Sequence, residues 1–529
     1  LVVLLGGPRF VYRLLKDRRL DFRLERGDYR RIPVLLAGAD DSAALFIRAV
    51  QHKADAEYRV VGIIGEGAGR VGREIYGIPV LGTFTELTKV VGHLSRLGEK
   101  PQRVILTKDD IDGGSVRRLL DEAEALGMTL SRLPRLTEFK SGVTDKVAPR
   151  PIAIEDLLGR PQTVLDRKGM KTLINGRRIL VTGAGGTIGA ELVRQIADLD
   201  PSHMVLLDNS EFNLYTVDME LAGSHPGLSR CPVLGDVRDA RRIGEVMAEQ
   251  RPELVFHAAA LKHVPMVESN PLEGVMTNVL GTRVVADACR TSGVLTMVLI
   301  STDKAVNPTS IMGATKRIAE KYCQSLDSLG PGTRFITVRF GNVLGSTGSV
   351  VPLFQKQLAA GGPLTVTHPD IKRYFMTVRE AVELVLEASS LGAVEGRYRG
   401  RIFVLDMGQP VLIADLARQM IRLAGLRPEV DVKIVYTGLR PGEKLFEEIF
   451  HGAEPPVPTE RGGILVATAR ASEHRPLAAA LGACADACRD RDLDRLMRLV
   501  LNLVPEFQGG KPQGGETRRE IDLNNRPAT

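Results

Sequence analysis

A strand, a glycine-rich turn and a helix follow one another from Arg178, and this unit constrains the fold more than any other feature of the sequence. The predicted strand RILV at 178–181 leads into the turn TGAGGTIG at 182–189, and a helical pattern continues to Ala197. Glycines in such a turn let the backbone approach a pyrophosphate, and the first turn of the helix offers its amide hydrogens to it. The unit predicts a parallel α/β sheet that binds a dinucleotide.

The residues expected around the dinucleotide lie in this turn and at the ends of the following strands. The next predicted strand, 204–207, leads to Asp208, whose carboxylate is placed to accept hydrogen bonds from ribose hydroxyls. Asn209 and Ser210 come next, and the lack of a basic residue there favours NAD over NADP. The expected cofactor-binding residues are Gly183, Gly185, Gly186, Thr187, Ile188, Gly189, Asp208, Asp236, Val237, Ala258, Ala259 and, in a later helix, Lys316.

Two other glycine patterns are not expected to hold a cofactor. At 37–42 the sequence AGADDS lies between a strand and a helix, but Asp40 and Asp41 would repel a pyrophosphate. At 67–72 the sequence GAGRVG matches the dinucleotide fingerprint, yet only four residues separate it from Gly77, too few for a phosphate-binding helix. We interpret the second pattern as a loop.

The order of strands, helices and breakers predicts an α/β chain with two Rossmann-like domains in tandem. The first domain is expected over 29–131, with strands at 32–38, 58–64 and 101–107 and a helix at 42–52. A Pro- and Arg-rich linker at 132–175 leads to the second domain at 176–453. Residues 454–529 form an extension to which the sequence assigns no role.

Charge is distributed unevenly along the chain. Of a net charge of +7, most lies in residues 8–31, which hold nine basic and four acidic residues. The nearly neutral remainder argues against a nucleic-acid-binding surface. Residues 1–7 are apolar and run into the basic stretch, which fits either the end of a membrane helix or a frayed amphipathic helix.

Polar residues also follow a predicted strand at 298–300. Ser301, Thr302, Asp303 and Lys304 stand at the end of this strand, where open α/β sheets bind ligands, and the next helix opens at 312–316. The five cysteines lack the spacing of a metal site. We therefore expect reduced thiols and no metal.

Five strings carry a resemblance to a known family: DNSEFNLY at 208–215, HAAALKHVP at 257–265, ISTDKA at 300–305, FGNVLGS at 340–346 and RPGEK at 440–444. They resemble the membrane-bound polysaccharide-biosynthesis (CapD-like) nucleoside-diphosphate-sugar 4,6-dehydratases, long form, of the extended short-chain dehydrogenase/reductase superfamily. The resemblance covers about residues 29–450. It implies a degenerate first Rossmann-like domain and an NAD-dependent catalytic domain with a parallel sheet and a small C-terminal substrate subdomain.

In that family the sugar is oxidised at C4, loses water across C5 and C6, and receives the hydride at C6. The resemblance assigns the acid and the base to Asp303 and Lys304, so the pKa of Asp303 is expected to rise and that of Lys304 to fall. Met312 stands where short-chain dehydrogenases generally carry a catalytic tyrosine, four residues before Lys316, as in the long dehydratases. Removal of the 4-hydroxyl proton then falls to a water, Thr302 or Asp303.

The resemblance also implies the substrate site. Arg373 is expected to bind the diphosphate because a guanidinium can contact two oxygens at once, and UDP-N-acetylglucosamine is the expected substrate. The expected substrate-binding residues are Lys262, Asn342, Ser346, Arg373, Arg440 and Glu443.

Two alternatives stay open, a UDP-sugar 4-epimerase and a non-catalytic NAD-binding membrane scaffold. Met312 and the Asp303-Lys304 pair argue against the epimerase. The resemblance favours a truncated membrane helix and a basic juxtamembrane segment at 1–28, with the enzyme on the cytoplasmic side of the inner membrane, and implies a homo-oligomer.

Overall fold

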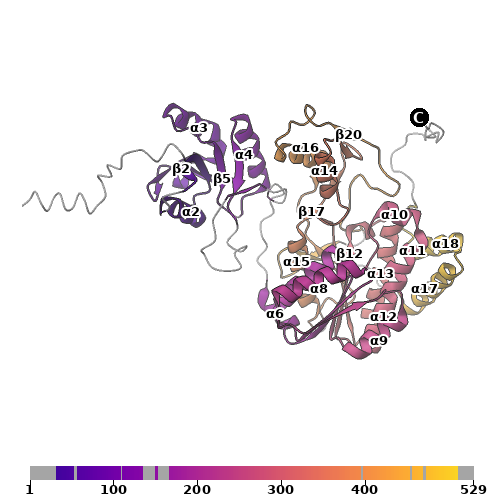
Figure 1. The fold of residues 1–529 in the computed structure, drawn as a ribbon. Coiled ribbons are helices and arrows are strands. Elements are labelled where there is room, and N and C mark those ends of the chain that lie inside the picture. The colour runs from indigo at the N-terminus through magenta and orange to yellow at the C-terminus, as the bar shows by residue number, and fades with distance from the viewer. Residues whose placement is uncertain are drawn as a thin grey trace, which may run out of the picture. The chain divides into compact units, whose positions relative to one another are not determined.

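The computed structural model describes residues 31–52, 56–108, 110–134, 149–152, 156, 166–394, 397–452, 455–468 and 472–509 (Figure 1). They fall into two compact units, divided between residues 161 and 162. Each unit has its own sheet built mainly from parallel strands. The predicted α/β fold with two Rossmann-like sheets in tandem is therefore confirmed.

The first unit contains a seven-stranded sheet of order β3-β4-β2-β1-β5-β6-β7. Its strands are β1 (Ile32–Ala37), β2 (Tyr58–Gly65), β3 (Glu74–Ile75), β4 (Ile78–Thr83), β5 (Arg103–Leu106), β6 (Thr129–Arg132) and β7 (Arg150–Pro151). Its helices are α2 (Asp41–His52), α3 (Leu87–Arg96) and α4 (Gly113–Ala125). Apolar side chains of β1, β2 and α2 share one buried core, which confirms the predicted strands and helix.

Side chains close the turn after β1. The Asp40 carboxylate accepts from the Ala43 N–H at the start of α2 (3.0 Å), and the Thr107 hydroxyl donates to the Gly38 carbonyl (3.0 Å). A carboxylate thus stands at the helix N-terminus, where a phosphate would otherwise bind. In the second glycine pattern a 3₁₀ turn, Ala68–Arg70, lies within the pattern, and the short strand β3 follows it instead of a helix, which confirms that this segment is a loop.

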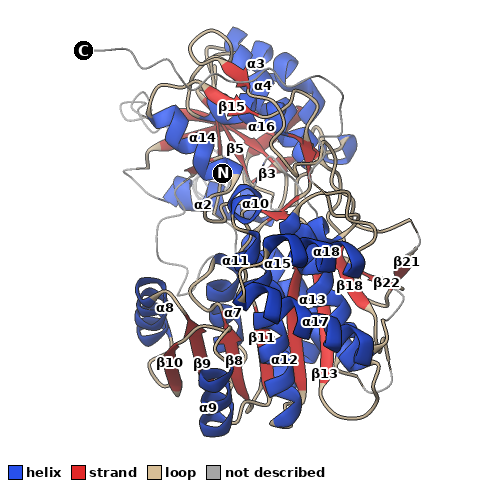
Figure 2. Ribbon diagram, turned by 90° about the vertical axis from the view of Figure 1, so that its right-hand side faces the viewer, coloured by secondary structure: helices blue, strands red, loops and turns tan. Residues whose placement is uncertain are grey.

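The second unit contains a nine-stranded sheet of order β10-β9-β8-β11-β12-β13-β18-β22-β21 (Figure 2). Its parallel strands are β8 (Arg178–Thr182), β9 (His203–Asp208), β10 (Arg230–Leu234), β11 (Leu254–His257), β12 (Thr296–Thr302), β13 (Arg334–Phe340) and β18 (Ile402–Leu405). β21 (Pro456–Pro458) and β22 (Ile464–Ala467) extend it in the antiparallel sense. The central strands are apolar runs because helices cover both faces.

One face of this sheet is covered by α6 (Arg167–Ile174), α7 (Thr187–Ala197), α8 (Glu211–Ser224) and α15 (Val378–Gly392). The other is covered by α9 (Ala240–Gln250), α12 (Thr282–Thr291), α13 (Ile311–Asp327), α17 (His474–Arg489) and α18 (Leu493–Leu503). Leu481 of α17 and Val500 of α18 are completely buried in this second core. The described part of the C-terminal extension therefore packs as part of the second unit.

Small two-stranded sheets lie in the part of the second unit where a substrate subdomain is predicted. β14 (Asn342–Val343) pairs with β17 (Phe375–Met376), β15 (Leu364–Val366) with β20 (Ile434–Tyr436), and β16 (Lys372–Arg373) with β19 (Val411–Leu412). α14 (Val350–Ala359) and α16 (Ile413–Leu423) lie beside β15 and β20, apart from the large sheet (Figure 1).

No helix within the described ranges has both the length and the apolar character needed to cross a membrane. Residues 1–28, for which a membrane segment is predicted, lie outside the described residues.

Candidate active site

The turn after β8 is shaped so that only glycine fits. A Cβ at Gly183 would lie 2.6 Å from the Ala259 nitrogen, and one at Gly189 would lie 1.9 Å from the Gly183 carbonyl oxygen. A Cβ at Gly185 would lie 2.5 Å from that of Asn213. The turn therefore packs directly on the neighbouring backbone and leaves the approach to α7 open, as a pyrophosphate site requires.

Asp208 fixes this turn. Its Oδ2 accepts from the Gly185 N–H and its Oδ1 from the Ser210 N–H, both at 2.8 Å. α7 begins after Gly186 without a side-chain cap, so the amides of Thr187 and Ile188 stand at an open helix N-terminus. The donor set and the glycine cradle fit a dinucleotide.

The other expected cofactor residues lie at the ends of strands in the same sheet. Asp236 and Val237 follow β10, and Val237 packs against Gly281. Asp236 pairs with Arg238 at 2.6 Å. Ala258 and Ala259 follow β11 and border the glycine turn, so each residue lies where the sequence placed it.

Lys316 is buried in α13, one turn after Met312, and its Nζ donates to the Ile300 carbonyl (2.6 Å). Burial lowers the pKa of Lys316 to about 8. Burial and the Lys316 charge also lower the pKa of His257 to about 3, so this imidazole stays neutral between the hydroxyls of Thr182 and Thr282. Lys316 is thus the titratable group of this region near neutral pH.

Thr302, Asp303 and Lys304 form a tight turn at the end of β12. The Thr302 hydroxyl donates to Asp303 Oδ1 (2.8 Å), and Lys304 Nζ donates to the same oxygen (3.0 Å) and to Asn342 Oδ1 (2.9 Å). Asp303 is completely buried, and its Oδ2 has no hydrogen-bond partner among the described residues. The acid and the amine of the expected pair are therefore in direct contact.

The expected fall in the pKa of Lys304 is not found. Burial lowers the pKa, but Asp303 and Glu447 together outweigh it and raise the pKa above its ordinary value. Two carboxylates next to one ammonium stabilise the charged form. Lys304 is therefore an ammonium in the ligand-free protein.

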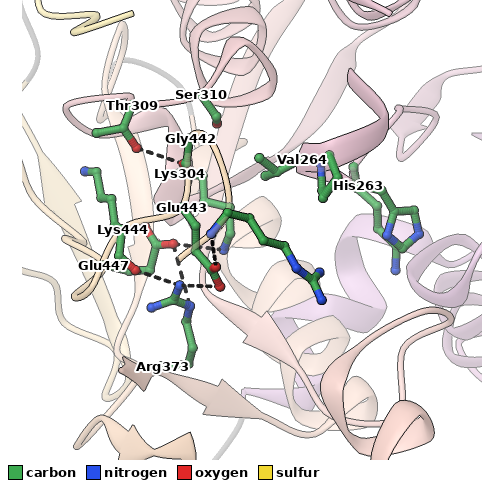
Figure 3. A pocket seen from close by; sticks show the side chains of 13 residues that line it. His263, Val264, Lys304, Thr309, Ser310, Arg373, Gly442, Glu443, Lys444 and Glu447 are labelled. Carbon is green, nitrogen blue, oxygen red and sulfur yellow. Dashed lines mark hydrogen bonds and ion pairs between the residues drawn. The ribbon is translucent and has the colours of Figure 1, made fainter. Parts of the chain in front are cut away.

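A cavity of about 200 Å³ opens above this turn (Figure 3). Among the expected substrate residues, Lys262, Arg373, Arg440 and Glu443 line it. Asn342 contacts the site through Lys304. Ser346 does not line it and lies next to Thr347, whose N–H donates to Thr187 Oγ1 (3.3 Å), so the structure places Ser346 beside the glycine turn.

Arg373 is already engaged within the protein. Its guanidinium donates to the carbonyls of Lys372 (2.8 Å) and Lys444 (2.8 Å) and pairs with Glu443 (3.4 Å), and Figure 3 shows it facing Glu443 and Glu447. The expected bidentate contact with a diphosphate would need these bonds to open. Arg440 lines the same cavity and is exposed, which favours it as the diphosphate ligand.

Two groups at the site were missed by sequence reasoning. Glu447 lines the cavity and lies 3.7 Å from Lys304 Nζ. Next to the turn at 302–304, Glu320 accepts from Ser301 (2.7 Å) and binds the guanidinium of Arg339, 2.8 Å from its Nη2. The only sequence signal for Glu447 was its place three residues after the RPGEK string.

Burial opposes a charge on Glu320, yet the Arg339 guanidinium holds its pKa below the usual range. Glu320 is therefore ionised, and it links β12, which ends at this turn, to both α13 and β13.

Comparison with known proteins assigns the chain to a family. Residues 179–469, more than half of the chain, match the family model of the polysaccharide biosynthesis proteins. The chain belongs to this family. It is 39% identical over 459 residues to the capsular polysaccharide biosynthesis protein CapD of Staphylococcus aureus. The matched region covers 86% of this chain and 73% of that protein.

Further relatives match about half of the chain. A UDP-N-acetylglucosamine 4,6-dehydratase (inverting) of Campylobacter jejuni is 34% identical over 279 residues, 52% of this chain and 78% of that protein. A UDP-glucose 4-epimerase of Rickettsia canadensis is 34% identical over 282 residues, 52% of this chain and 77% of that protein. The X-ray structure of Pen from Bacillus thuringiensis, 32% identical, covers 55% of this chain and 88% of that one with a TM-score of 0.50.

This family member is a nucleotide-sugar-modifying enzyme of the extended short-chain dehydrogenase/reductase superfamily, either a dehydratase or an epimerase.

Proposed function

We propose that this protein is an NAD-dependent nucleoside-diphosphate-sugar 4,6-dehydratase. The observation that carries the proposal is the contact between the Asp303 carboxylate and the Lys304 amine, 3.0 Å apart beneath the cavity. An elimination needs an acid and a base in one place, whereas epimerisation at C4 needs neither at C6. Met312, which cannot titrate, stands where short-chain dehydrogenases generally carry a tyrosine, and in this it resembles the long dehydratases.

NAD, when bound, supplies the hydride chemistry, which is oxidation at C4 and reduction at C6. The glycine cradle, Asp208 and the open N-terminus of α7 would hold it, and Lys316 would contact its nicotinamide ribose.

The protons are moved by residues of the catalytic turn. The Thr302 hydroxyl and Asp303 Oδ1, 2.8 Å apart, form a path by which Asp303 takes the 4-hydroxyl proton. Asp303 then gives this proton to the departing C6 hydroxyl, which leaves as water. Lys304 removes the C5 proton and later returns one to C5. Both residues end the cycle in the state in which they began, and the sugar has lost one water.

We infer a uridine diphosphate sugar, with UDP-N-acetylglucosamine as the expected substrate and a 4-keto-6-deoxy sugar for surface polysaccharide or glycan synthesis as the product. The relative that acts on this substrate by name supports the inference. Lys262 and Arg440 on the cavity wall supply positive charge for the diphosphate.

The 4-epimerase is a second candidate because relatives of both kinds match with equal identity. Mass spectrometry of UDP-N-acetylglucosamine incubated with the protein and NAD separates the two. A dehydratase product is one water lighter, whereas an epimerase leaves the mass unchanged. Lys304→Ala should strongly slow the loss of water, and Lys108→Ala in the first unit should not affect it. An unchanged mass with the unmodified protein would refute the dehydratase.

A further inference from the structure

Glu447 is a second carboxylate beside Lys304 that the mechanism above does not use. Its Oε1 lies 3.7 Å from Lys304 Nζ and 3.8 Å from Arg373 Nε, and its side chain is 4% exposed. Its Oε2 is buried and has no hydrogen-bond partner in the described part of the chain. An ionised oxygen without a partner is costly in the interior, and a proton on this carboxyl would relieve that cost.

The charged groups around Glu447 come from three elements. Asp303 and Lys304 lie in the turn after β12, Arg373 lies on β16, and Lys444 lies three residues before Glu447 in the same loop segment. Burial raises the pKa of Glu447, and the three nearby cations do not bring it back to its ordinary value. Glu447 is thus a buried carboxyl that can accept a proton from a neighbouring donor.

Lys304 must lose a proton before it can act as a base, because Asp303 and Glu447 keep it charged in the ligand-free protein. Asp303 cannot take this proton, since it carries the 4-hydroxyl proton at that stage. Lys304 Nζ is 0.7 Å farther from Glu447 Oε1 (3.7 Å) than from Asp303 Oδ1 (3.0 Å), a difference that a small rotation of the lysine removes.

We propose that Glu447 accepts the Nζ proton of Lys304 when the sugar nucleotide fills the cavity, so that Lys304 meets the C5 hydrogen as a free amine. The proposal rests on the dehydratase function. Filling the cavity removes water from both groups, which favours the neutral amine and carboxylic acid over the ion pair. After the C5 proton is returned, Glu447 gives its proton back to Lys304, and the pair regains its original charges.

The test compares Glu447→Gln with Glu448→Gln, a matched change at the neighbouring, half-exposed glutamate. With internal transfer, the dehydration rate of the unmodified enzyme is independent of pH near neutrality. In Glu447→Gln the proton must leave to solvent, so we expect a loss of about 100-fold at pH 7 and a rise of about tenfold per pH unit above it. The primary isotope effect with 5-deuterated substrate should increase, and Glu448→Gln should match the unmodified enzyme.

A uniform loss at all pH values with an unchanged isotope effect would indicate a structural role and overturn the proposal, as would an unchanged rate. If Glu447→Gln does not fold, Glu447→Asp carries the test. It keeps an acceptor at a longer distance, so its profile should stay flat while the isotope effect rises. An isotope effect equal to that of the unmodified enzyme would overturn the proposal.

A second readout needs neither NAD nor sugar. Acetic anhydride acylates free amines, and mass spectrometry of the peptide containing Lys304 reports its reactivity against pH. Removing the Glu447 charge should lower the pKa of Lys304, so its acylation at a fixed pH should increase in Glu447→Gln and not in Glu448→Gln. Equal reactivity would show that the two groups are not coupled. That result would overturn the role of Glu447 and leave the proposed function standing. An unmodified enzyme that removes no water from the sugar nucleotide would instead overturn the proposed function.

Discussion

The two units each place a glycine turn between a strand and a helix, but they use the helix N-terminus in opposite ways. After β1, Asp40 caps the first turn of α2, and Thr107 bonds to the backbone of Gly38. After β8, no side chain caps α7, and the carboxylate of Asp208 binds the Gly185 amide from the neighbouring strand. A carboxylate at the helix therefore closes the site, whereas one on the adjacent strand shapes it.

The strand ends differ in the same manner. In the first unit Lys108 is half-buried and pairs with Glu66, and this hydrogen bond raises its pKa. In the second unit Lys304 contacts an acid, lines a cavity and is bonded to Asn342. An ion pair becomes a candidate for catalysis only where a cavity and a cofactor cradle adjoin it.

The largest expected effect is the difference in dehydration rate between alanine variants of the two strand-end lysines. Lys304→Ala removes the proposed base and should lower the dehydration rate by about 10³-fold. Lys108→Ala, in an ion pair at the first unit's strand end, should leave the rate unchanged. Product mass and initial rates measure both, and an equal loss in the two variants would remove the functional distinction between the units.

The next largest effect is expected on NAD affinity when the glycine turn after β8 is altered. A methyl group at Gly189 would lie 1.9 Å from a backbone oxygen, so Gly189→Ala must shift the turn, and we expect NAD affinity to fall by about 100-fold, near 2.7 kcal/mol. Gly244→Ala in α9, where a Cβ has no neighbour within 4 Å, is the control and should retain affinity. Titration calorimetry measures both affinities. If Gly189→Ala binds NAD as tightly as the unmodified protein, the cofactor does not bind at this turn.

Lys316 gives a pH dependence that the first unit should lack. Its pKa is lowered by burial to about 8, so the ammonium that would contact NAD is lost above that pH, and affinity should fall by up to tenfold per unit. The unfolding free energy without NAD should rise with pH between about 8 and the ordinary value of 10.5, because the unfolded chain then binds more protons. Lys316→Arg keeps the charge and should flatten both curves.

The smallest effect concerns the cap of the first unit. Asp40→Ala removes the hydrogen bond to the Ala43 amide and should destabilise that unit by about 1 kcal/mol. NAD affinity should not change. Thermal unfolding measures the stability and titration calorimetry the affinity. Loss of NAD binding in Asp40→Ala would show that the cofactor does not bind at the turn after β8.

Local patterns predicted the two sheets and the cofactor cradle because strand, turn and helix are adjacent in the sequence. Glu447 could not be predicted, since 143 positions separate it from Lys304 and only the folded chain brings them to 3.7 Å. The direction of the Lys304 pKa shift depended on this missing carboxylate. The engagement of Arg373 by backbone carbonyls was equally invisible, because a sequence does not show which donors are already used.

The last strands have a consequence for biosynthesis. β22 lies between β18 and β21 and supplies the antiparallel partner of β18, although its residues, 464–467, come nearly 300 positions after β8. During translation the first unit can close its sheet long before the second, whose β18 keeps an unpaired apolar edge until β22 emerges. A ribosome that stalls in this interval would hold a nascent chain whose catalytic sheet is prone to pair with other polypeptides.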